Sequence, residues 1–156
     1  MSHCKANAWH WTPAIGTAIL RKISRLPQPA GKFMKKILIV EDNADIRRLV
    51  RMTLESADYE ILEATDGESG LHLAQVIRPD LVLLDVMMPG DIDGLEVCRQ
   101  IRQSADLTDI RVVLLTARGQ IKDREAGLAA GANAYLAKPF SPLQLIDTVD
   151  QWLQDP

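Results

Sequence analysis

Several features are missing from this sequence of 156 residues, and each absence disfavours a class of protein. No apolar run approaches the roughly 20 residues that a membrane-spanning helix needs. Only two cysteines occur, Cys4 and Cys98, far apart in the chain, which argues against a disulfide scaffold and fits a reducing compartment. The histidines show no metal-ligand spacing, so no zinc site is expected. We therefore expect a cytoplasmic protein that does not enter a membrane.

Motifs for nucleotide binding are also missing. A P-loop requires a glycine-rich loop that ends in Lys-Ser or Lys-Thr, and the sequence has none. A dinucleotide site requires a glycine fingerprint after the first strand, but here Glu41 and Asp42 occupy that turn and would repel a pyrophosphate. An aspartate-based phosphatase usually has a second acid two residues after its nucleophile, where this chain has Met87. These three activities are disfavoured.

Acidic residues are absent from residues 1–33, which contain five basic side chains. The rest of the chain carries 13 basic and 21 acidic side chains, a net charge of −8. Such an acidic domain is poorly suited to direct nucleic-acid binding and better suited to a cation or to basic partners.

We interpret residues 1–33 as an N-terminal basic extension and residues 34–156 as the domain. Ala14–Ile23 could form a short helix, but the surrounding prolines favour a mobile tail. Two alternatives are a basic arm that docks on a partner and translation that begins at Met34.

The stretch Leu81–Pro89 organises the rest of the chain. Four aliphatic residues lead into Asp85, and Pro89-Gly90 then starts a loop. A continuous apolar run of this length is typical of a strand buried on both faces of a parallel sheet. A carboxylate in such a run is costly unless it is paired. We therefore expect Asp85 at the carboxyl end of the strand, facing a polar crevice.

From Met34 onward, patterns typical of strands and helices alternate. Strands are expected at 37–40, 59–64, 81–85, 110–115 and 133–137. Helices are expected after Asn43, after Gly67, around 95–101, from about Gln120 and after Ser141. Leu49 is expected on the inner face of the first of these helices. The alternation predicts an α/β fold, with a five-stranded parallel sheet in the flavodoxin-like order 2-1-3-4-5 and helices on both faces.

Polar residues end four of the predicted strands. The first strand ends in Glu41 and Asp42, the third in Asp85, the fourth in Thr116 and the fifth in Lys138. In the predicted fold these ends lie along one rim, where ligands of open α/β sheets bind. Clustered carboxylates repel one another, and a hard cation such as Mg²⁺ relieves that repulsion. The set predicts a site for phosphoryl transfer to a carboxylate.

Four segments resemble the motifs of the response-regulator receiver domain of bacterial two-component signalling. They are Ile-Leu-Ile-Val-Glu-Asp-Asn at 37–43, Leu-Leu-Asp-Val-Met-Met-Pro-Gly at 83–90, Leu-Leu-Thr-Ala-Arg at 114–118 and Ala-Tyr-Leu-Ala-Lys-Pro-Phe at 134–140. The resemblance covers residues 35–154, in the family's order and spacing. It implies that Asp85 accepts a phosphoryl group from a sensor histidine kinase or a histidine phosphotransfer protein.

The resemblance also implies a metal site. Asp42 and Asp85 resemble the direct Mg²⁺ ligands, Glu41 resembles the acid that acts through water, and Met87 stands where the family uses a backbone carbonyl. Lys138 resembles the lysine that pairs with the phosphoryl group, and its bond to the following proline resembles the family's cis peptide.

Thr116 and Tyr135 resemble the family's switch pair. On phosphorylation the hydroxyl would approach the phosphoryl group, and the ring would turn inward. That movement would alter the face formed by the helix from about Gln120, the fifth strand and the last helix. We expect a downstream protein to bind this face, through residues that include Lys122, Arg124 and Asp147.

The expected function is a phosphorylation-dependent signalling switch, not a metabolic enzyme; it catalyses only its own phosphorylation and dephosphorylation. The alternative is a phosphorylation-independent adaptor on the same fold. Formation of a homodimer is a further way in which phosphorylation could be read out. One departure from the family is visible, since the run from Pro89 to the Asp93-Gly94 pair is one residue longer than usual and adds Asp91.

Overall fold

The computed structural model describes residues 33–117 and 121–154. From Met34 onward the chain forms one compact unit. The basic extension predicted for residues 1–33, with its short helix at Ala14–Ile23, lies outside the described residues apart from Phe33.

Five parallel strands form a single sheet in the order β2-β1-β3-β4-β5. Their bounds are β1 Lys35–Val40, β2 Tyr59–Ala64, β3 Leu81–Asp85, β4 Arg111–Ala117 and β5 Ala134–Lys138. The predicted fold class and strand order are confirmed. β4 and β5 reach Ala117 and Lys138, one or two residues further than expected, because the ladder between these strands continues to that pair.

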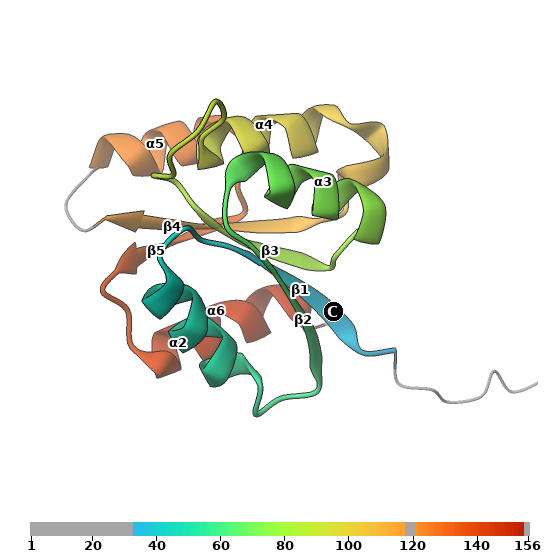
Figure 1. The fold of residues 1–156 in the computed structure, drawn as a ribbon, viewed down its shortest axis with the longest axis vertical. Coiled ribbons are helices and arrows are strands. Elements are labelled where there is room, and N and C mark those ends of the chain that lie inside the picture. The colour runs from blue at the N-terminus through green and yellow to red at the C-terminus, as the bar shows by residue number, and fades with distance from the viewer. Residues whose placement is uncertain (1–32, 118–120, 155–156) are drawn as a thin grey trace, which may run out of the picture. The chain divides into compact units, whose positions relative to one another are not determined.

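Helices cover both faces of the sheet (Figure 1). α2 (Ala44–Leu54) and α6 (Pro142–Leu153) pack on one face, and α3 (Gly67–Ile77), α4 (Gly94–Gln103) and α5 (Ile121–Ala129) lie on the other. A short 3-10 turn, η1 (Ala105–Leu107), follows α4. Among the helices of the described residues, none is both long and apolar enough to cross a membrane.

Side-chain caps fix where the helices begin. Asn43, Asp66 and Asp93 each accept backbone N–H bonds at the start of α2, α3 and α4. Ser141 and Gln144 form a reciprocal capping box at the start of α6. These four capped helices each follow a strand of the parallel sheet, so their first turns lie at the edge formed by the carboxyl ends of the strands.

Two apolar cores lie on either side of the sheet, and β3 is buried along its whole length. The core under α3 and α4 includes Leu38, Leu84, Val97, Cys98, Ile101 and Leu114. The core under α2 and α6 includes Ile39, Val50, Leu54, Leu83, Leu115 and Leu145. The prediction that Leu49 faces inward is wrong. It is 47% exposed, because Val50 and Leu54 already turn the buried side of α2 toward the sheet.

Tyr59, at the start of β2, is tied to α6 by a phenol that donates to Asp150 Oδ1 at 2.9 Å. Burial and then the bond to Asp150 raise the pKa of Tyr59 to about 12. A raised pKa in the folded state contributes stability that is complete below the unfolded value, about 10, and is lost as pH rises through 12.

Tyr59→Phe should therefore cost about 1 kcal/mol of unfolding free energy at neutral pH, the usual worth of one hydrogen bond. The difference in unfolding free energy between wild type and Tyr59→Phe should become smaller as pH rises from 10 toward 12. Urea unfolding at a series of pH values measures it. A gap that stays constant to pH 12 would contradict this role of Tyr59.

Candidate functional site

Asp85 is the last residue of β3, and the fold buries it. It pairs in register with Leu115 of β4 and is only 4% exposed. The amide of Met87 donates to Asp85 Oδ1 at 3.2 Å. Burial, and then the charge of Glu41, raise the pKa of Asp85 to about 7. The predicted position at the end of a buried strand is where the carboxylate lies.

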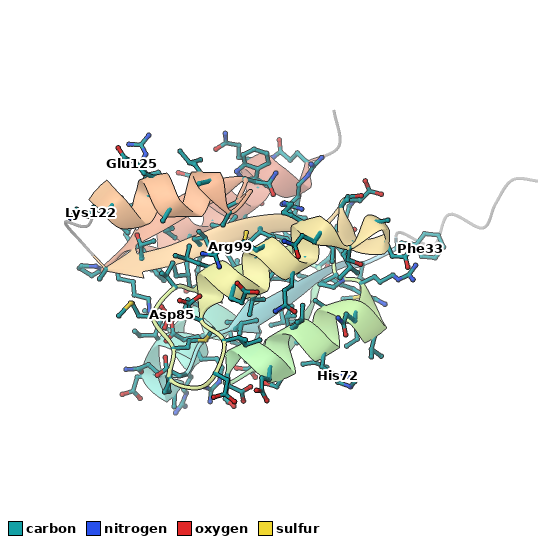
Figure 2. All side chains as sticks on the ribbon, turned by 90° about the horizontal axis from the view of Figure 1, so that it is seen from above. Phe33, His72, Asp85, Arg99, Lys122 and Glu125 are labelled. Carbon is teal, nitrogen blue, oxygen red and sulfur yellow. The ribbon has the colours of Figure 1, made fainter. Side chains whose placement is uncertain are left out.

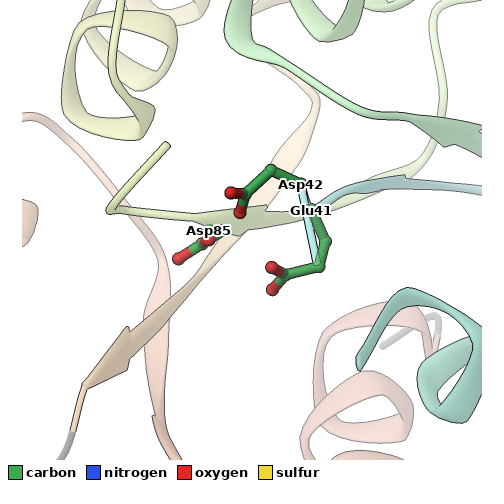
Figure 3. A group of neighbouring side chains, drawn as sticks. All are labelled: Glu41, Asp42 and Asp85. Carbon is green, nitrogen blue, oxygen red and sulfur yellow. The ribbon is translucent and has the colours of Figure 1, made fainter. Parts of the chain in front are cut away.

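Glu41 and Asp42 follow β1, the strand beside β3, and turn toward Asp85 (Figure 3). One carboxylate oxygen from each of the three residues lies within 4.8 Å of the others. Glu41 is fully buried, whereas Asp42 is exposed. The site therefore has a closed side, formed by Glu41, and an open side, formed by Asp42.

Lys138 reaches the same place from the end of β5. Its Nζ lies 2.7 Å from Glu41 Oε2 and 3.2 Å from Asp85 Oδ1. Burial alone would lower the pKa of Lys138, but the hydrogen bond and charge of Glu41, with those of Asp85, outweigh burial and raise it. One ammonium therefore bridges two buried carboxylates. The peptide bond between Lys138 and Pro139 is cis, as the resemblance implied.

Thr116 and Tyr135 lie on neighbouring strands near this cluster. Thr116 comes one residue after the register partner of Asp85 and is 4% exposed. Tyr135 pairs in register with Leu114 and is 37% exposed, so its ring lies on the surface in this structure. Met87 also turns its side chain outward, 66% exposed, which is compatible with a role for its backbone alone.

Other predicted residues lie apart from the carboxylates. Lys122, Arg124 and Asp147 are exposed on α5 and α6. Asp91 is exposed on the long loop after β3, where it lines a hollow of about 250 Å³ with Asp66. The added charge of Asp91 is therefore not one of the three carboxylates that converge.

Two residues that shape the site escaped the sequence-based reasoning. Arg47 donates to the carbonyl of Glu41 at 2.8 Å and so holds the turn that carries the acidic pair. Gly94 begins α4 directly beneath Asp85, where a Cβ would lie 2.0 Å from the Asp85 carbonyl oxygen. The only sequence signal for Gly94 is its place after the helix cap Asp93; Arg47 gives none beyond its helical position.

The donor set suits a hard divalent cation. Glu41, Asp42 and Asp85 offer only oxygen ligands, which Mg²⁺ prefers. Lys138, which lies between Glu41 and Asp85, is the cation that contacts two of these carboxylates. Asp42 lies on the open side of the cluster, where an ion could enter. The residues present therefore fit the metal that the resemblance implied.

Comparison with known proteins accounts for this arrangement. The family model described as "Response regulator receiver domain" matches residues 37–150. This chain belongs to the response-regulator receiver family. Receiver domains act in two-component signalling as phosphorylation-dependent switches, and they bind Mg²⁺ at an acidic cluster like the one formed here by Glu41, Asp42 and Asp85.

The receiver domain is similar to a curated transcriptional regulator, ResD of Bacillus subtilis. The two are 46% identical over 111 residues, which cover 71% of this chain and 45% of ResD. The chain spans less than half the length of the curated relatives it matches, between 42% and 48% of each. Those relatives are regulators, not metabolic enzymes.

Solved structures show the same fold. A response regulator of Chloroflexus aurantiacus is 38% identical and superposes with a TM-score of 0.74, over 77% of this chain and 98% of the other. The receiver domain of a sensor histidine kinase of Pseudomonas aeruginosa PAO1 is 34% identical, with a TM-score of 0.70 over 76% and 97% of the two chains. That structure contains a magnesium ion in its active-site cleft.

Proposed function

We propose that Asp85 is the phosphoryl acceptor of a signalling switch, supplied by a phosphohistidine of a sensor histidine kinase or a histidine phosphotransfer protein. The observation that carries the proposal is the position of Asp85. It is a buried carboxylate at a strand end, 3.2 Å from the ammonium of Lys138 and within 4.8 Å of two further carboxylates. A structural aspartate would need only the lysine, and the extra acids would destabilise it.

The reaction is a transfer between two nucleophiles. A carboxylate oxygen of Asp85 attacks the phosphorus of the donor, a phosphorus–oxygen bond forms, and the phosphorus–nitrogen bond to the imidazole breaks. The electron pair goes to that nitrogen, which takes up a proton. Dephosphorylation is attack by water on the same phosphorus, with the Asp85 carboxylate as the leaving group. Both steps place negative charge next to Lys138, which stabilises it.

Mg²⁺ bound by Asp42, Asp85 and the Met87 carbonyl would neutralise charge on the transferred group. The chain's own residues do the remaining work. Burial excludes water around Asp85, Glu41 holds Lys138 at 2.7 Å, and Lys138 is thereby aimed at the Asp85 oxygens. Because burial and Glu41 raise the pKa of Asp85 to about 7, a bound cation would also favour the ionised nucleophile.

The output surface in this proposal is the face of α5, β5 and α6. Thr116 would move toward the phosphoryl group and Tyr135 would turn inward, which changes the surface that a downstream protein meets. A separate apolar pocket of about 310 Å³ lies beside Lys138 and is lined by Ile46, Leu49 and Phe140 among others. A donor protein could dock on it next to Asp85.

A magnesium titration tests the metal part of the proposal. Asp42→Asn should weaken Mg²⁺ binding at least about tenfold, a typical loss when a metal site is disturbed. Asp91→Asn removes the same charge from the loop outside the carboxylate cluster and should leave the affinity nearly unchanged. Isothermal titration calorimetry gives both values. Equal affinities for wild type and Asp42→Asn would contradict the assignment, and no binding by wild type would favour the phosphorylation-independent adaptor.

A further inference from the structure

The ring of Tyr135 has a cationic neighbour that the proposed switch does not use. The guanidinium carbon of Arg124, on α5, lies 4.7 Å from the centroid of the Tyr135 ring, on β5. A guanidinium within about 6 Å of an aromatic centroid is attracted by the negative face of the ring. The contact therefore favours the outward position in which Tyr135 is 37% exposed.

We propose that Arg124 is a positioning residue that holds Tyr135 outward and so opposes activation in the absence of phosphorylation. The proposal rests on the proposed function, because it assumes that Tyr135 turns inward when Asp85 is phosphorylated. It adds a specific restraint on the inward movement of the Tyr135 ring, and this restraint comes from a side chain outside the phosphorylation site.

The packing of α5 explains how Arg124 comes to lie over the ring. Gly127, one turn after Arg124, lies so close to β4 that a Cβ there would be 2.5 Å from Leu114 Cδ1. Leu114 is the register partner of Tyr135 on the neighbouring strand. Residues three apart share a helix face, so the close approach at Gly127 brings Arg124 over the adjacent edge strand.

The inward movement would separate the two groups. Thr116 pairs in register with Ala137, two residues after Tyr135 and on the same face of β5. Thr116 is only 4% exposed, whereas Arg124 is exposed on α5. A ring that turns inward toward Thr116, over the small side chain of Ala137, would leave the surface position in which it meets the Arg124 guanidinium. The contact is therefore present in one state and absent in the other, which is the condition for shifting an equilibrium between them.

Lys122 and Glu125, the charged neighbours of Arg124 on α5 whose side chains the structure describes, do not make this contact. Lys122 and Glu125 project from α5 at the edge of the molecule (Figure 2). Among the described residues, Arg124–Tyr135 is the one cation–ring contact found. Without a ring contact, the charge of Lys122 would act on Tyr135 through a longer-range field, which salt screens. Lys122→Met is thus a matched control for loss of one positive charge from the same helix.

The test compares Arg124→Met with Arg124→Lys and Lys122→Met, with a fluorine label on Tyr135 observed by NMR. In the unphosphorylated protein, Arg124→Met should raise the ratio of inward to outward ring about two- to fivefold, the factor that corresponds to an exposed cation–π contact. Arg124→Lys should retain most of the restraint, and Lys122→Met should leave the ratio unchanged.

The rate of phosphorylation by a small phosphodonor is a second measurement. It would not change if Arg124 only stabilised the fold. Arg124→Met should accelerate it by up to the same factor, and the acceleration should vanish when Tyr135→Ala is added. An unchanged ring ratio in Arg124→Met, with wild type still responding to phosphorylation, would overturn the inference alone. A wild-type ring that ignores phosphorylation would overturn the proposed switch and the inference together.

Discussion

Replacing Asp85 with asparagine is expected to abolish covalent phosphorylation while leaving the receiver domain folded. Asparagine has nearly the shape of aspartate, so β3 keeps its packing, but its amide cannot act as the nucleophile. Lys138 keeps its partner Glu41 at 2.7 Å. The measurement is retention of radiolabelled phosphate on the protein after incubation with a phosphorylated histidine donor.

The matched control for that experiment is Asp91→Asn, since Asp91 is an exposed acid on the loop that follows β3. It should label like wild type. Label on Asp85→Asn equal to that of wild type would place the acceptor elsewhere. Loss of label in both variants would show that the effect of Asp85→Asn is not specific to the buried carboxylate.

The same variant has an expected effect on stability without magnesium. Burial and Glu41 raise the pKa of Asp85 to about 7. The stability contributed by its bound proton is complete below the unfolded pKa, about 4, and is lost as pH rises through 7. Asp85→Asn should therefore unfold at higher urea concentration than wild type above pH 7, and excess Mg²⁺ should narrow the difference.

Gly94→Ala is expected to impair both stability and phosphorylation. A Cβ at this position would lie 2.0 Å from the carbonyl oxygen of Asp85 and 2.9 Å from Val86 Cα. These are backbone atoms, so the strand end itself must shift, and overpacking of this kind costs about 1–3 kcal/mol or more. A displacement of about 1 Å at a reacting group can slow a reaction roughly 100-fold.

Gly127→Ala is the matched control for Gly94→Ala. A Cβ at Gly127 would be 2.5 Å from Leu114 Cδ1, which is the end of a side chain and not a backbone atom. Alanine also favours a helix over glycine by about 1 kcal/mol. This variant should unfold within about 1 kcal/mol of wild type in urea. If Gly94→Ala behaved like Gly127→Ala in both assays, the close packing beneath Asp85 would have no functional consequence.

The sequence could predict the strands because their burial is nearly complete. The run from Leu81 to Asp85 has no polar interruption before its carboxylate, and its short length and the Pro89-Gly90 pair that follows favour a buried strand over a helix. The alternation of five strands with five helices then restricts the topology to few choices. The residues at the strand ends could be named for the same reason, since parallel strands place their carboxyl ends on one rim.

Side-chain partners could not be predicted in the same way. Periodicity placed Leu49 on the inner face of α2, but the width of the buried stripe depends on how the helix is rotated against the sheet. The bridge that Lys138 makes to Glu41, and the contact of Arg124 with Tyr135, join residues brought together only by the fold. Gly94 likewise matters because the fold packs it against the backbone of Asp85, a contact that no local sequence pattern reveals.

The central claim is that Asp85 is a magnesium-dependent phosphoryl acceptor. Its most direct test is the intact mass of the wild-type protein after incubation with acetyl phosphate, with Mg²⁺ or with a chelator. We expect a single phosphoryl adduct with Mg²⁺, none with the chelator, and fragmentation that locates the group on the peptide containing Asp85. An adduct that forms equally well with the chelator, or one located on another peptide, would contradict the claim.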